Sequence, residues 1–150
     1  MTEIGFYHLT KTSLPDALFR LLEKILASGK RVVVRAGSVE RVEFLNDALW
    51  TIDAASFLPH GTDKEGNGFK QPIWLTAEFT NPNDAEVLIL TDGADGAAYQ
   101  DFDRCLEIFD GNDNEAVIAA RERWRKFKDR GLSLTYWKQI ESGRWEKAFE

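Results

Sequence analysis

Few side chains in this sequence are of the types that carry out covalent chemistry or bind metals tightly. There are two histidines, His8 and His60, and one cysteine, Cys105. A zinc site would need carboxylates to complete it, and no candidate ligands have a recognisable spacing. His60 could act with Asp63 as a general base, but no serine or cysteine in a strained turn presents itself as the nucleophile. We therefore expect no catalytic residue and no metal site, and we interpret His60 as a side chain that hydrogen-bonds within its own loop.

Two glycine-containing segments resemble ligand-binding loops but lack residues that such loops need. Residues 63–68 resemble the start of a calcium loop, but Trp74 occupies the position that should supply a bidentate glutamate. Residues 91–96 follow a strand candidate, yet they contain two acidic residues and no following lysine, so we predict a turn there. No glycine-rich phosphate loop and no dinucleotide fingerprint occurs in the sequence. We therefore expect no cofactor.

The composition is typical of one soluble domain, and we expect residues 1–150 to form it. The N-terminus lacks a basic region followed by a long apolar run, and no segment approaches membrane-spanning length, so we expect a cytoplasmic protein without membrane contact. Cys105 lies in an apolar run and should be a buried, inert thiol. The net charge of −6 predicts that direct contact with DNA is weak or absent.

One segment departs from this acidic character. Residues 121–130 contain six basic and two acidic side chains, a local charge of +4, so the remainder of the chain carries −10. At helical spacing, the apolar residues from 116 to 127 fall on one face, and Arg121, Arg125 and Lys128 follow its border. Such an edge suits a short acidic peptide with a hydrophobic end, because arginine can fork onto a carboxylate beside an apolar wall. The alternative is a core helix with a merely solvated outer edge, including Trp124 as a core residue.

The elements that must position these residues alternate between strand and helix patterns. We predict strands over residues 5–9, 31–35, 72–76, 87–90, 104–109 and 132–140. Helices are predicted from a cap at Ser13 to Gly29, from a cap at Ser38 to about residue 49, and from Asn112 or Asn114 to Arg130. The order predicts an α/β fold with three α/β/α layers and a mainly parallel central sheet of about six strands, without a working nucleotide-binding loop.

The longest irregular segment connects the second predicted helix to the third predicted strand. It places Phe57, Leu58 and Pro59 next to His60, in a region where loop residues are expected. Clustered apolar side chains in a loop either pack under the domain or contact a partner. Both interpretations remain open from the sequence.

Five short motifs, taken in order along the chain, resemble the chi subunit family of bacterial DNA polymerase III. They are residues 6–9 (FYHL), 48–50 (ALW), 56–61 (SFLPHG), 121–124 (RERW) and 134–138 (LTYWK). The resemblance implies a non-catalytic accessory protein of the clamp-loader complex with an α/β/α fold. It also implies a bridge, through the psi subunit, between the clamp loader and the acidic C-terminal tail of single-stranded DNA-binding protein.

The resemblance implies roles for particular residues. Arg121 would bind the carboxylate of the tail, and Trp124 would form an aromatic wall beside it. Arg125 and Lys128 would attract the acidic residues upstream in the tail. Val117 occupies a position where some relatives carry a basic residue, which implies a weaker or differently oriented grip. The residues that would contact psi, or another clamp-loader subunit in bacteria without a recognisable psi, are Trp50, Phe57, Leu58, Pro59 and His60.

The competing hypothesis is a small nucleotide-binding or hydrolytic enzyme on a doubly wound sheet. The missing phosphate loop, metal ligands and nucleophile count against it. The sequence therefore favours a protein-binding subunit of the replication machinery.

Overall fold

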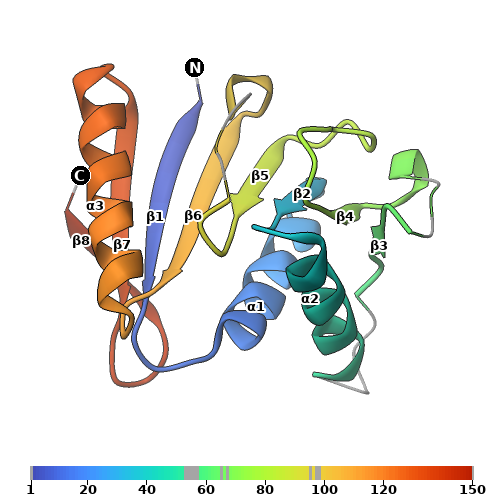
Figure 1. The fold of residues 1–150 in the computed structure, drawn as a ribbon, viewed down its shortest axis with the longest axis horizontal. Coiled ribbons are helices and arrows are strands. Elements are labelled where there is room, and N and C mark those ends of the chain that lie inside the picture. Colours follow the sequence, from blue (N-terminus) through green and yellow to red (C-terminus); the bar gives the residue numbers. More distant parts are fainter. Residues whose placement is uncertain are drawn as a thin grey trace.

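The computed structural model describes residues 2–52, 58–64, 66, 68–94, 96 and 99–149, which build one sheet with helices on both faces (Figure 1). The strand order is β3-β4-β2-β5-β6-β1-β7-β8, and every described pairing except that of β7 with β8 is parallel. The strands are β1 (Glu3–Leu9), β2 (Val32–Arg35), β3 (Gly61–Thr62), β4 (Ile73–Thr76), β5 (Val87–Leu90), β6 (Arg104–Asp110), β7 (Ser133–Gln139) and β8 (Trp145–Phe149). The predicted mainly parallel sheet is confirmed.

Three α-helices begin at side chains that cap their first turn. They are α1 (Leu14–Ala27), α2 (Val39–Thr51) and α3 (Asn114–Asp129), and the 3-10 turns η1 (Gly68–Lys70) and η2 (Tyr99–Asp101) lie in connections. Ser13 accepts a hydrogen bond from the backbone N–H of Asp16, and Ser38 accepts one from that of Arg41, so both predicted caps are confirmed. Asp113 caps α3, between the two starting points that the sequence suggested.

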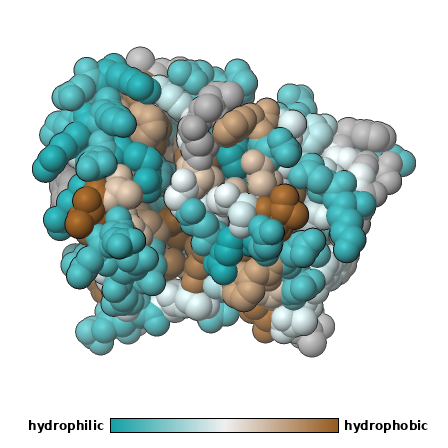
Figure 2. Space-filling view, viewed as in Figure 1, coloured by the Kyte–Doolittle hydropathy of each residue, from teal (hydrophilic) through white to brown (hydrophobic). Residues whose placement is uncertain are grey.

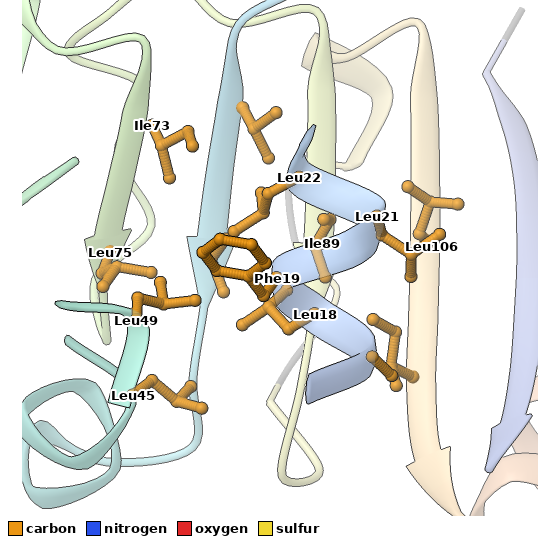
Figure 3. Close-up of a cluster of buried hydrophobic side chains, with 14 of the residues drawn as sticks. Leu18, Phe19, Leu21, Leu22, Leu45, Leu49, Ile73, Leu75, Ile89 and Leu106 are labelled. Carbon is orange, nitrogen blue, oxygen red and sulfur yellow. The ribbon is translucent and has the colours of Figure 1, made fainter. Parts of the chain in front are cut away.

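Helices α1 and α2 cover one face of the sheet, where the larger aliphatic core lies. Figure 3 shows Leu18 and Leu22 of α1 and Leu45 and Leu49 of α2 pointing toward Ile73, Leu75, Ile89 and Leu106 of the strands. Strand β2 is buried on both faces, because Val32 and Val34 join this core while Val33 joins the core on the opposite face. Continuous burial of β2 is the pattern expected inside a parallel sheet.

Helix α3 covers the opposite face, over β6 and β7, and completes the predicted three layers. Its buried residues Ala120 and Phe127 pack with Phe6 of β1 and Cys105 of β6. This second core is richer in aromatic rings, and Phe6 meets Phe127 edge-on at a ring-centroid distance of 6.3 Å. Cys105 is fully buried, as expected, and burial with the neighbouring Glu107 raises the pKa of its thiol.

The sheet has eight strands rather than about six because two segments without a strong strand pattern pair with its edges. Strand β3 is only two residues long. It lies within the segment predicted as a loop and pairs with β4. Residues 143–147, which the sequence analysis left outside any element, begin a hairpin instead. Gly143 has φ of 83°, and the backbone N–H of Ile140 donates to the carbonyl of Arg144 at 2.9 Å, so the chain turns back along β7.

The side-chain amide of Gln139, at the end of β7, joins this hairpin to the loop that follows β1. Its Oε1 accepts hydrogen bonds from the backbone N–H groups of Thr10, Lys11 and Thr12 at 3.0 to 3.2 Å. Its Nε2 donates to the Thr12 hydroxyl at 2.8 Å and to the Gly143 carbonyl at 3.2 Å. Gln139 is buried, so its amide satisfies backbone donors that would otherwise have no protein partner there.

Gln139→Ala should therefore lower the free energy of unfolding by about 2 to 4 kcal/mol, because three backbone donors lose their acceptor together. Gln139→Glu is the matched control, since it retains the acceptor oxygens but loses the amide donors, and it should cost less. Chemical denaturation of the three proteins measures both effects. An alanine variant as stable as the wild type would show that water replaces the amide without cost.

Candidate functional site

A group of polar and aromatic side chains lies where β1, β6 and β7 meet the middle of α3. The parallel register places His8 beside Phe109 of β6 and beside Lys138 of β7. Alternation along these strands directs His8, Phe109 and Lys138 to the same face as Phe6, which is the face that α3 covers. Residues from three strands and one helix therefore converge on this face of the sheet.

Edge-on ring contacts link the helix to the strands in what we call the aromatic cluster, formed by Phe6, His8, Phe109, Trp124 and Tyr136. Trp124 lies 5.3 Å from Phe6 and 5.7 Å from Tyr136 between ring centroids, with interplanar angles of 74° and 77°. Trp124 is half-buried, so it packs against the core and also presents ring surface at the edge of α3. The two interpretations of Trp124 from the sequence are therefore compatible.

His8 is held in a fixed position within this cluster. Its Nδ1 and the hydroxyl of Tyr136 share a hydrogen bond of 2.6 Å. Gly111 makes room for the imidazole, because a Cβ atom there would lie 2.1 Å from the His8 ring. Any larger residue at position 111 would displace the ring.

The site is positively charged around these rings. The pKa of His8 is lowered, first by burial and then by the nearby Lys138 and Arg121, while Asp110 opposes the shift. Burial raises the pKa of the Tyr136 hydroxyl, and Arg121 partly offsets that effect. Arg121 is thus an electrostatic neighbour of both groups, and His8 is neutral at pH 7.

Of the sequence-predicted residues of α3, Arg121 lies beside the aromatic cluster and Trp124 belongs to it. Arg121, Arg125 and Lys128 are exposed along one border of the helix, and Val117 is half-buried against the core. Figure 2 shows hydrophilic side chains gathered over α3 on this face of the molecule. The sequence analysis missed His8, Tyr136 and Lys138 as site residues, although they lie in motifs that it singled out, because only the strand register places them beside α3.

The second predicted surface lies at the C-terminal end of α2. Trp50 is 48% exposed, and its ring contacts that of His60 at a centroid distance of 4.3 Å and an interplanar angle of 36°. His60 and Leu58 are buried, and Nδ1 of His60 donates to the Leu58 carbonyl at 2.6 Å, which confirms the predicted hydrogen bond within the loop. Pro59 is half-buried, and Phe57 lies outside the described residues. A partner contact at this surface stays a prediction.

The described residues lack two other features that could indicate a function. These residues contain no group of three or more His, Cys, Asp or Glu side chains that could hold a metal ion. No helix among them is long and apolar enough to cross a membrane.

A family profile and two related proteins all indicate the same family. The sequence profile of the family described as "DNA polymerase III chi subunit, HolC" matches residues 1–135. The chain is 33% identical over 109 residues to the "Probable DNA polymerase III subunit chi" of Rickettsia prowazekii (strain Madrid E), covering 73% of this chain and 66% of that protein, slightly less than two thirds of its length. It is 28% identical over 144 residues to the "DNA polymerase III subunit chi" of Escherichia coli (strain K12), covering 89% of this chain and 96% of that protein.

An ion pair fixes α3 to the sheet beneath the site. Nε of the half-buried Arg123 lies 2.5 Å from Oε1 of Glu107 on β6, and Glu107 is only 3% exposed. Oε2 of Glu107 has no hydrogen-bond partner among the described residues. Burial raises the pKa of Glu107 to about 7, because the cost of burying the carboxylate outweighs the attraction of Arg123.

This pKa shift predicts how stability changes with pH. Since the folded pKa of about 7 lies above the ordinary value of 4.5, the folded state binds the extra proton, and Glu107 lowers stability as the pH rises between these values. Glu107→Gln keeps an oxygen for Arg123 and does not titrate. The variant should gain roughly 1 to 3 kcal/mol relative to the wild type between about pH 5 and about pH 8, measured by urea denaturation. A difference between the two proteins that does not change with pH would contradict the shift.

Proposed function

The chain belongs to the DNA polymerase III chi subunit family, and on this premise we propose that it links the clamp-loader complex to the acidic C-terminal tail of single-stranded DNA-binding protein. In this role it acts as a non-catalytic subunit in the cytoplasm, and residues 1–150 serve as one chi-like domain. One sheet with a core on each face supports that organisation.

The observation that carries the tail-binding proposal is the position of Arg121, a cationic side chain on the border of α3 beside the aromatic cluster. The guanidinium of Arg121 binds the terminal carboxylate of the tail, and Trp124 with Val117 provides the apolar wall for its hydrophobic end. Arg125 and Lys128 attract the acidic residues upstream along the same border. Lys138 adds positive charge from the sheet.

A linking function needs a second surface that stays free when the tail is bound. The exposed ring of Trp50 lies on α2, which packs near β3 and β4, whereas α3 packs over β6 and β7 on the other face. We assign the contact with psi, or with another clamp-loader subunit, to the surface around Trp50 and Pro59. Phe57, Leu58 and His60 are the remaining residues of this predicted contact. Leu58 and His60 are buried, and the hydrogen bond between them stabilises the loop that carries Pro59.

Arg121→Ala should weaken binding of a tail peptide roughly ten- to a hundredfold, because the carboxylate loses its charged partner in a partly desolvated site. Isothermal titration of the peptide into the two folded proteins measures the change. Lys128→Ala should retain most of the affinity and mainly reduce its dependence on salt, since this side chain attracts the peptide through solvent.

Two matched controls separate this effect from a general loss of positive charge or of partner binding. Arg130→Ala removes an exposed arginine at the end of the same helix, and Trp50→Ala alters the other proposed surface. Both should bind the peptide as the wild type does. If Arg121→Ala folds and binds with unchanged affinity, the tail site lies elsewhere.

His8 should make tail binding depend on pH. In the free protein the pKa of His8 is lowered first by burial and then by the charges of Lys138 and Arg121. A bound carboxylate offsets these two charges, so binding should raise this pKa and take up a proton. Affinity should therefore increase as the pH falls from about 7.5 to about 5.5.

Titrations across this range test the effect of His8, with His8→Gln as the variant that retains a polar side chain near Tyr136 but does not titrate. The glutamine variant should bind with an affinity that is nearly independent of pH. An identical pH profile for the two proteins would exclude His8 as the titrating group.

A further inference from the structure

A groove of about 1210 Å³ lies on the face of the sheet opposite α3. One wall is α1, with Leu21 and Ile25, and the other is the hairpin of β7 and β8, with Trp137 and Trp145. Tyr7 of β1 and Leu106 of β6 form the floor. The groove is therefore separated from the tail site by the thickness of the sheet.

Aromatic rings line the hairpin side of the groove. Tyr7 stacks on Trp137 with a centroid distance of 6.2 Å and an interplanar angle of 13°, and it meets Trp145 edge-on at 5.0 Å. Both tryptophans are half-buried, so part of each ring remains open.

The rim of the groove is positive, although the whole chain carries a net charge of −6. Its basic lining residues outnumber its acidic ones by five to three: Arg20, Lys24, Lys30, Arg104 and Arg144 against Glu23, Glu86 and Asp103. Glu86 already interacts with Lys30 at 4.0 Å and with the backbone N–H of Arg31. Across the whole rim the basic side chains exceed the acidic ones by two; Arg20 and Lys24 flank Glu23 on α1, and Arg144 lies on the hairpin, so the rim favours an acidic occupant.

The sheet beside the groove has little helical cover. Parallel sheets normally have both faces covered by helices, but among the described residues the helix in extensive contact with β7 is α3, on the other face, whereas α1 contacts mainly β6 on this face. A helix with its side chains is about 10 Å across and rises about 1.5 Å per residue, so about ten residues fill roughly 1200 Å³. The groove therefore has room for a short helix.

We propose that this groove binds an acidic amphipathic helix of a partner protein. The apolar face of that helix packs on Tyr7, Trp137 and Trp145, and its carboxylates face Arg20, Lys24 and Arg144. A single-stranded nucleic acid is the less favoured occupant, because it carries a phosphate at every nucleotide and would place some of them against Glu86 and Asp103, whereas a helix can present its carboxylates to the basic rim alone.

Selection from a displayed library of random peptides of about sixteen residues tests the proposal on the full chain, with a charge-reversed variant, Arg20→Glu with Lys24→Glu, as the counter-target. Both substitutions are on the exposed side of α1 and should leave the fold intact. The enriched peptides should be acidic, with apolar residues at helical spacing. Their affinity should fall at least about tenfold in the charge-reversed variant and in Trp145→Ala.

Arg121→Ala is the matched control, because it removes the proposed tail anchor and should leave these affinities unchanged. A loss in Arg121→Ala alone would mean that the selected peptides occupy the tail site, and it would overturn the proposal. So would a selection that enriches no peptide, or one that enriches basic peptides. A thymidine dodecamer that binds the wild type and loses affinity in Trp145→Ala would assign the groove to nucleic acid instead.

Discussion

The alternation of side chains along β1 is the constraint on which the candidate site under α3 and the groove on the opposite face both depend. Strand β1 lies between β6 and β7, and its backbone pairs with both neighbours along almost its whole length. Phe6 and His8 therefore point toward α3, while Tyr7 points toward α1 and the hairpin. A slip of one residue in register would exchange these side chains between the two faces and remove both arrangements at once.

Helix α3 has to satisfy two demands with one short sequence. Its inner face fills the second core through Ala120 and Phe127, and its border carries the exposed basic residues that give the site its charge. Glu107 and Arg123 show the energetic conflict in this arrangement, because a buried carboxylate is costly even beside a guanidinium. The ion pair gives α3 a defined position on β6. The same contact that costs free energy through the buried carboxylate therefore orients the helix that carries Arg121.

Local sequence patterns predicted most of the helices and strands. The features that they missed depend on pairing between strands that are distant in the sequence. The caps at Ser13 and Ser38 and the triple valine of β2 carry strong local signals, and each was placed correctly. Strand β8 has no such signal, since its sequence WEKAF places Glu146 and Lys147 side by side instead of alternating polar with apolar residues, and its partner strand supplies the pairing. The helical half of the candidate site followed from periodicity, but His8 and Lys138 join it only through the parallel register with β7.

Sequence neighbours on β7 contribute to opposite surfaces, and this limits how the two surfaces can influence each other. Tyr136 contacts Trp124 and His8 on the α3 face, and the next residue, Trp137, stacks on Tyr7 in the groove. Because these contacts share the packed strands β1 and β7, a ligand on one face meets a preformed sheet whatever occupies the other. Coupling between two sites requires an element with two arrangements that both ligands bias. A sheet fixed by side chains on both faces instead favours independent binding at the two proposed surfaces.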